Sequence, residues 1–122
     1  MCRLLLCDKK YYNNVGRHYL ERFLNHLEKE CGGHGNGLLL VKDGKIVFMK
    51  KGINYTAESC AKKILKEDFD YVLWHTRVKS VGEVKNSNCH PYVSKKHNFA
   101  LMMNGTESQF GALANGLGIT DT

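Results

Sequence analysis

The chain has 122 residues, 43% of them apolar and 25% charged, which is the composition of one folded domain and excludes a largely disordered chain. No apolar run approaches the roughly 18 residues of a membrane-spanning helix, and the run at residues 4–6 is too short for the core of a signal peptide, so we expect a cytoplasmic protein without a membrane partner. The net charge of +6 comes from scattered lysines without interleaved aromatic residues, which favours a solvated surface over a nucleic-acid interface.

The first half of the chain combines one short apolar run, one helical pattern and one hairpin. Residues 2–7 have the length of a strand, and a polar turn is expected around Asn13 and Asn14. Residues 15–30 predict a helix, because apolar side chains recur there at steps of three and four: Tyr19, Leu20, Phe23, Leu24 and Leu27. The glycine-rich residues 31–37 end that helix. Residues 37–42 and 45–50 then predict a hairpin, because Asp43-Gly44 suits a type I′ turn.

The second half predicts two strands flanked by helices. Thr56 is a suitable N-cap for a helix that runs to about residue 66, and residues 70–76 form an aromatic, β-branched strand. A long polar loop over residues 77–92 holds the only proline, and residues 98–103 predict another strand. Thr106 can cap a last helix with an apolar face, ended by two glycines. This order indicates a mixed α+β fold. Because the sequence stops just after that helix, we expect a truncated form of a longer parent or an unusually minimal form.

The five cysteines are an odd, scattered set without a C-x-x-C pair, which favours free thiols over a disulfide framework. Cys31 with His34, and Cys89 with His90, come closest to metal-ligand spacing, but no second ligand pair accompanies either. We therefore expect no metal and no other cofactor. The cysteines other than Cys2 are interpreted as small buried apolar residues.

Cys2 directly follows the initiator methionine. Aminopeptidases remove Met1 when the next side chain is small, so processing would leave one residue with both a thiol and a free α-amine. The amine titrates near pH ~8 and the thiol near ~8.5, so the amine can accept the thiol proton close to neutrality. A nucleophile that is weak at its free pKa needs such a base beside it. Cys2 is therefore a candidate nucleophile.

Four further segments accompany Cys2 in a fixed order. They are residues 33–38 (GHGNGL), 75–77 (HTR), 82–91 (GEVKNSNCHP) and 104–105 (NG). With the Met-Cys start and the final triplet Thr120-Asp121-Thr122, this ordered set resembles the glutaminase domain of class II glutamine amidotransferases, which belong to the N-terminal-nucleophile hydrolases. Members of that family begin Met-Cys and carry a His-x-Arg segment, an Asn-x-His-Pro turn and a later Asn-Gly after a strand. The resemblance spans almost the whole chain and so implies one glutaminase-type domain over residues 1–122.

The resemblance also implies a fold, a reaction and a set of roles. The fold is the four-layer αββα sandwich of that superfamily, or most of it, incomplete at the C-terminus. Cys2 would attack the side-chain amide of glutamine, form a γ-glutamyl thioester and release ammonia. Asn104 and the backbone N–H of Gly105 would form the oxyanion hole. Arg77 would bind the substrate carboxylate, and Asp121 would bind the α-ammonium group.

The remaining features leave alternatives open. His75 is expected to orient other groups rather than act as a base, because the α-amine already fills that role. Family members commonly have His where this chain has Met103, and residues 78–81 read VKSV instead of a small-residue run that ends in His. One alternative is an amidohydrolase of a modified glutamine or γ-glutamyl compound, and the other is a non-catalytic scaffold or regulatory module. The implied partners are a small-molecule substrate and, for ammonia transfer, a separate acceptor or synthase subunit.

Overall fold

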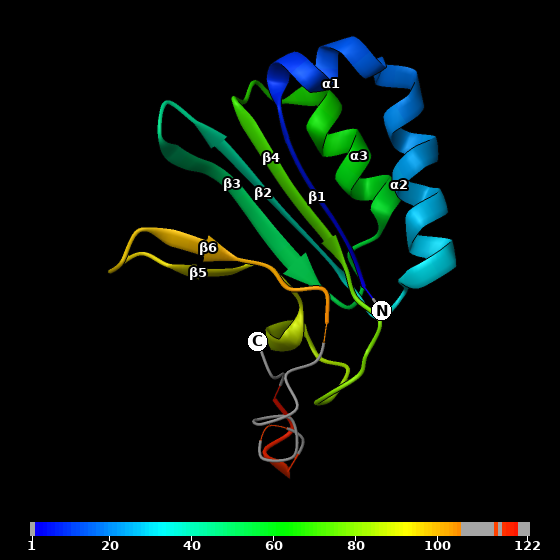
Figure 1. The fold of residues 1–122 in the computed structure, drawn as a ribbon, viewed down its shortest axis with the longest axis vertical. Helices are drawn as coiled ribbons and strands as arrows, with labels where there is room; N and C mark the ends of the chain where they lie inside the picture. Colours follow the sequence, from blue (N-terminus) through cyan, green and yellow to red (C-terminus); the bar gives the residue numbers. More distant parts are fainter. Residues whose placement is uncertain (1, 106–113, 115, 120–122) are drawn as a thin grey trace.

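The computed structural model describes residues 2–105, 114 and 116–119. Within them it has a mixed α/β fold, as expected: three α-helices cover one face of a four-stranded antiparallel sheet, and a two-stranded ribbon lies on the other side (Figure 1). The order of strands in the sheet is β1 (Arg3–Asp8), β4 (Tyr71–Thr76), β2 (Asn36–Lys42) and β3 (Lys45–Gly52). The ribbon consists of β5 (Tyr92–Ser94) and β6 (Phe99–Leu101). The helices are α1 (Lys9–Val15), α2 (Arg17–Cys31) and α3 (Ala57–Lys66), with a 3-10 turn, η1 (Asn86–Asn88).

The hydrophobic core lies between the helices and one face of the sheet. Leu38 and Leu40 of β2 and Val72 and Trp74 of β4 are fully buried in this core. Because side chains alternate along a strand, His75 lies on the opposite face of the sheet. The helices and their connections contribute Tyr12, Leu20, Leu24, Tyr55, Ala57, Cys60, Ala61, Ile64 and Phe69. The strands therefore separate the core on the helix side from the residues on the other face.

Two local sequence signals are confirmed. Asp43 and Gly44 have φ angles of 51° and 72°, so both central residues of the hairpin turn are in the left-handed region that a type I′ turn requires. The Thr56 side chain accepts a hydrogen bond of 3.2 Å from the backbone N–H of Ser59, as an N-cap does. The hairpin of β2 and β3 and the start of α3 are thus set by residues within each segment.

The region around Asn13 and Asn14 forms helix α1, so the prediction of a polar turn there is wrong. Asp8 caps this helix, because its side chain accepts a hydrogen bond of 2.7 Å from the backbone N–H of Tyr11. Tyr12 anchors the helix on the core, with its ring centroid 5.3 Å from that of Phe69. One buried aromatic side chain outweighs the low helix propensity of the asparagines.

A polar contact fixes the start of β2 against two helices. The Glu28 carboxylate, in α2, accepts hydrogen bonds from the backbone N–H of Ala57, at 3.0 Å, and from the side chain of Asn36. Asn36 also donates to the carbonyl oxygen of Tyr55 at 2.8 Å, and it is only 1% exposed. The glycine-rich loop between α2 and β2 is therefore held at its β2 end.

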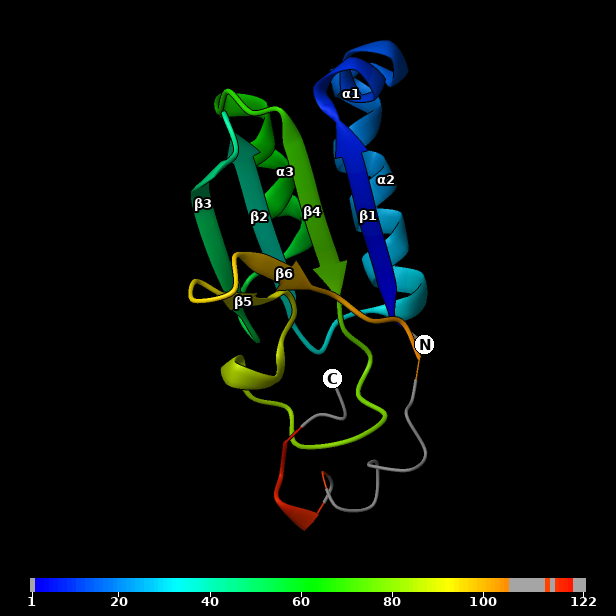
Figure 2. The ribbon, with the colours of Figure 1, turned by 60° about the vertical axis from the view of Figure 1, so that its left-hand side comes forward.

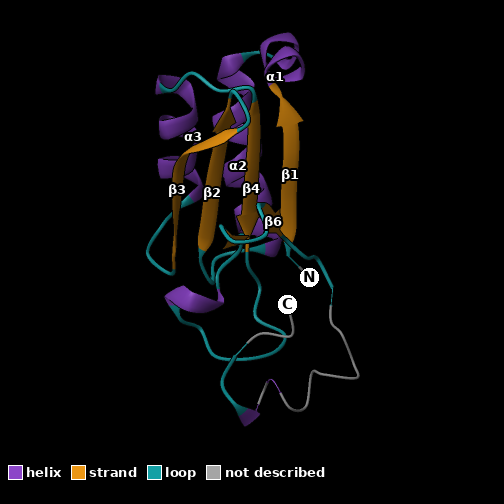
Figure 3. Cartoon of the chain, turned by 90° about the vertical axis from the view of Figure 1, so that its left-hand side faces the viewer, coloured by secondary structure: helices purple, strands orange, loops and turns teal. Residues whose placement is uncertain are grey.

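The last third of the described chain differs from the predicted pattern. Residues 92–94, for which no strand was predicted, form β5, and the predicted strand at residues 98–103 is shortened to β6. The predicted helix from Thr106 falls largely outside the described residues. Figure 3 shows that the long loop after β4 lies at the end of the sheet where β4 ends and β1 begins. That loop carries Arg77 and the motif at residues 82–91.

All five cysteines are free thiols. Cys60 and Cys89 are fully buried, as expected, whereas Cys7 and Cys31 are only half-buried. Among the described residues, no helix has the length and apolar character needed to cross a membrane.

Candidate functional site

Cys2 lies at the end of the sheet, immediately before β1. In the antiparallel pairing of β1 with β4, Arg3 is opposite Thr76, which brings Cys2 beside the residues that follow β4. Its sulfur accepts a hydrogen bond of 3.3 Å from the backbone N–H of Val78 and donates to the carbonyl oxygen of Val78 at 3.4 Å. Cys2 is 8% exposed. Val78, in the loop after β4, thus binds the candidate nucleophile through both its N–H and its carbonyl oxygen.

Arg77 precedes Val78 and is 3% exposed. Its guanidinium donates hydrogen bonds to the carbonyl oxygens of Val81, at 2.7 Å, and Glu83, at 2.8 Å. These bonds close residues 78–83 into a loop around the side chain. A guanidinium has five N–H donors, so the two carbonyls leave donors for a ligand. The structure therefore brings Arg77 next to Cys2 and gives it a structural task that the sequence did not suggest.

The glycine-rich loop packs against the same segment. The backbone N–H of Arg77 donates to the carbonyl oxygen of Gly35 at 2.8 Å. The backbone N–H of His34 donates to the carbonyl oxygen of Arg77 at 2.9 Å. The side chain of His34 accepts a hydrogen bond of 2.8 Å at Nδ1 from the backbone N–H of Lys79. The loop between α2 and β2 therefore braces residues 77–79, which in turn hold Cys2.

The segment before β5 approaches the sheet at Gly37. A Cβ built on Gly37 would lie 1.6 Å from the carbonyl oxygen of His90, so only glycine fits here. The His90–Pro91 peptide bond is cis. Asn88 donates to the carbonyl oxygens of Glu83 and Gly118, both at 2.9 Å, so it braces this loop. The loop after β4 is thus fixed to the sheet at one end and to itself in the middle.

His75 and His90 stack on each other with their ring centroids 4.2 Å apart. His75 Nε2 lies 3.1 Å from the carbonyl oxygen of Met103, and His90 Nδ1 accepts a hydrogen bond of 3.1 Å from the backbone N–H of Met103. Burial lowers the pKa of His75 to about 4 and that of His90 to about 3; the charge of Arg77 lowers both, and the neighbouring His75 and Lys51 lower that of His90. At these pKa values both rings are neutral at pH 7.

Asn104 and Gly105 follow Met103 directly and are exposed. The segment after β6 passes the end of the sheet where β1 begins and β4 ends (Figure 2). The two candidate oxyanion donors therefore belong to the same end of the molecule as Cys2 and Arg77. Asp121, the fifth predicted site residue, lies outside the described residues.

Three contributors to this site were not singled out from the sequence. They are the backbone of Val78, the side chain of His34 and the pairing of His75 with His90. A backbone group leaves no signature in a sequence. The one available signal was Gly37 within a strand, since glycine there marks a close approach of another backbone.

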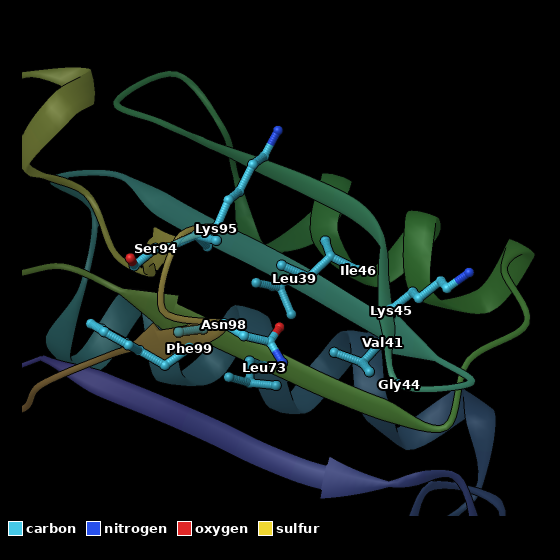
Figure 4. Close-up of a pocket in the computed structure, with 12 residues that line it drawn as sticks. Leu39, Val41, Gly44, Lys45, Ile46, Leu73, Ser94, Lys95, Asn98 and Phe99 are labelled. Carbon is cyan, nitrogen blue, oxygen red and sulfur yellow. The ribbon is translucent and has the colours of Figure 1, made fainter.

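A separate pocket of about 530 Å³ lies between the open face of the sheet and the ribbon (Figure 4). Leu39 and Leu73 contribute apolar surface, and Lys45 and Lys95 contribute positive charge. None of Cys2, Arg77, Asn104 and Gly105 lines it. The described residues also contain no cluster of three His, Cys, Asp or Glu side chains that could hold a metal ion.

Comparisons with known proteins add no relative: no protein-family model, curated protein or solved structure matches the chain.

Proposed function

We propose that the chain is an N-terminal-cysteine amidohydrolase of the glutaminase type, acting on the side-chain amide of glutamine. The observation that carries the proposal is the contact of the Cys2 sulfur with Val78, directly beside Arg77. It supports a thiol at the chain start that is held by the residue following a buried arginine. In this proposal the helices and the four-stranded sheet are two layers of an αββα sandwich, and the ribbon begins its second sheet.

The proposed reaction needs only groups that the chain supplies. After removal of Met1, the α-amine of Cys2 takes the thiol proton, and the sulfur attacks the amide carbon of the substrate. The C–N bond then breaks, the proton leaves with ammonia, and a γ-glutamyl thioester remains. Water hydrolyses the thioester, which restores the thiol and releases glutamate.

The other candidate residues would act on charges of the substrate. Asn104 and the N–H of Gly105 would donate to the amide oxygen while it carries negative charge, and losing one such donor typically costs about 3–4 kcal/mol of barrier. Arg77 would bind the carboxylate with the N–H groups that the carbonyls of Val81 and Glu83 do not use. Asp121 would bind the α-ammonium group.

A second candidate function is a non-catalytic module that keeps the fold. The burial of Cys2 and Arg77, which are 8% and 3% exposed, favours it, because both side chains already bond to backbone groups of the chain. In that case these residues would only stabilise the loop after β4.

Covalent labelling separates the two functions. Diazo-oxo-norleucine, a glutamine-analogue electrophile, should add to Cys2 in a chain whose intact mass shows that Met1 has been removed. Cys2→Ser should abolish the label, whereas the control Cys7→Ser, in the strand that follows Cys2, should keep it. Absence of label on a processed chain, or label on another cysteine, would contradict the enzyme and favour the non-catalytic module.

The substrate is tested by the products. Ammonia release from glutamine, compared with amine release across a panel of γ-glutamyl amides and peptides, separates a glutaminase from an amidohydrolase of a modified glutamine. A higher kcat/KM for a γ-glutamyl compound than for glutamine would replace glutamine as the substrate without removing Cys2 as the nucleophile.

A further inference from the structure

His75 and His90 come from separate parts of the chain and meet on the sheet face opposite the core. His75 is the fifth residue of β4 and is 0% exposed, and His90 lies just before β5 and is 3% exposed. Their rings stack with an interplanar angle of 27°. Buried imidazoles are costly unless their nitrogens are hydrogen-bonded. The hydrogen bonds that these two rings make therefore call for an explanation.

Both rings bind the same residue, and they bind its two opposite backbone groups. The carbonyl of Met103 can only accept, so His75 Nε2 carries a proton and donates to it at 3.1 Å. The N–H of Met103 donates to His90 at 3.1 Å, so His90 Nδ1 is unprotonated. We call this arrangement the Met103 clamp: the rings of His75 and His90 on the backbone of Met103.

The clamp is fixed to the rigid part of the molecule. His75 pairs with Leu4 of β1 and with Gly37 of β2, so a paired strand lies on each side of it. The carbonyl of His90 packs directly over Gly37. The segment that the clamp holds lacks such support one residue later: Asn104 and Gly105 are exposed, and no atom of the described residues lies within 4 Å of a Cβ built on Gly105.

The nitrogens of His75 are not placed for proton transfer. Its Nε2 is bound to Met103, and its Nδ1 is buried without a hydrogen-bond partner among the described residues. A general base must reach the proton that it abstracts. This geometry leaves His75 to position a backbone segment, the same segment that His90 binds through Nδ1.

We propose that the Met103 clamp positions Asn104 and Gly105 as oxyanion donors, so that His75 and His90 are positioning residues of the reaction; this inference rests on the proposed function. An oxyanion hole works only when its donors are fixed before charge develops. Asn104 follows Met103 directly. Holding the backbone of Met103 therefore fixes the position from which the Asn104 side-chain amide and the N–H of Gly105 extend. Misplacement by about 1 Å can cost on the order of 100-fold in rate.

The test uses paired substitutions in the full chain. His90→Leu and His75→Leu remove the hydrogen bonds to Met103. His90→Asn keeps an acceptor where Nδ1 lies, and His75→Gln keeps a donor where Nε2 lies. His26→Leu, at an exposed histidine of α2, is the matched control.

We expect each leucine variant to lower kcat for glutamine hydrolysis about 10- to 100-fold with KM within about 3-fold, and each amide variant to recover most of the loss. The inference would be overturned if kcat did not change in the leucine variants, or if kcat fell but the amide variants did not recover it. It would also be overturned if KM rose by the same factor by which kcat fell. Amide hydrogen exchange at Met103 tests the clamp without activity: exchange should accelerate at least 10-fold in His90→Leu and not in His90→Asn or His26→Leu. Unchanged exchange in His90→Leu overturns the clamp. If the parent chain is inactive and unlabelled but its Met103 amide is protected, the proposed function and the catalytic role are overturned and the clamp stands.

Discussion

Replacing Gly37 by alanine tests the closest backbone packing in the site. A Cβ at residue 37 would lie 1.6 Å from the carbonyl oxygen of His90 and 2.6 Å from its carbonyl carbon. These are backbone atoms, so no side-chain rotation can relieve the overlap. The His90 carbonyl must move by roughly 1.5 to 2 Å before the two atoms reach an ordinary contact distance. The whole segment before β5 must therefore shift away from β2.

The expected loss of stability follows from that shift. Overpacking in a fixed environment typically costs 1–3 kcal/mol, and the displaced segment also carries the stack of His90 on His75 and the hydrogen bond to Met103. We expect Gly37→Ala to lower the free energy of unfolding by about 2–4 kcal/mol.

Urea unfolding followed by tryptophan fluorescence measures this loss, because the only tryptophan, Trp74, is fully buried in the core. Gly116→Ala is the control, since none of the atoms in the described part of the chain lies within 4 Å of a Cβ at that position; the free energy of unfolding should change by no more than about 0.5 kcal/mol. If the free energy of unfolding of Gly37→Ala lies within about 0.5 kcal/mol of that of the parent chain, the packing argument is refuted.

Three further predictions concern charge and burial. The pKa values of His75 and His90 lie at about 4 and about 3 in the folded chain, near Arg77 and Lys51, so the unfolded chain binds more protons below about pH 6.5. The free energy of unfolding should therefore fall as pH decreases from about 6.5 towards 4, by up to about 1.4 kcal/mol per pH unit for each ring. Urea unfolding measured across this range should show a smaller dependence of that free energy on pH in His90→Asn than in the parent chain. Arg77→Leu should lower the free energy of unfolding by about 2–3 kcal/mol, because the carbonyls of Val81 and Glu83 lose their donors; Arg77→Lys should recover part of it, and equal stability of all three chains would contradict this. Burial raises the pKa of Cys60 to about 12, so iodoacetamide at pH 8 should modify half-buried Cys31 before Cys60 in the folded chain, and peptide mass spectrometry that finds the reverse order would contradict the packing of α3.

The elements that the sequence predicted are those whose signals are local. Asp43 and Gly44 define their turn by backbone preference alone, and Thr56 defines the start of α3 through its own hydroxyl. Helix α1 was missed because its stability comes from Tyr12 packing on Phe69, which is distant in the sequence. β5 was missed because three residues carry too short a pattern to distinguish a strand from a loop.

The candidate site depends more on tertiary structure. The proximity of Cys2 to Arg77 follows from the pairing of β1 with β4, and a sequence does not state which strands pair. The resemblance to a known family suggested both residues together, but it did not suggest that Arg77 would bind Val81 and Glu83. The meeting of His75 with His90 depends on the path of the loop after β4, which has no repeating pattern to predict it.

Adjacent positions of β4 serve opposite sides of the sheet. Trp74 fills the space under the helices, and His75, the next residue, binds the backbone of Met103. A substitution at one position leaves the surroundings of the other largely unchanged, whereas insertion or deletion of a single residue in this strand would exchange the two environments. Redesign of the chain can therefore vary one side of the sheet independently of the other, as long as every change preserves the even or odd spacing along the strand.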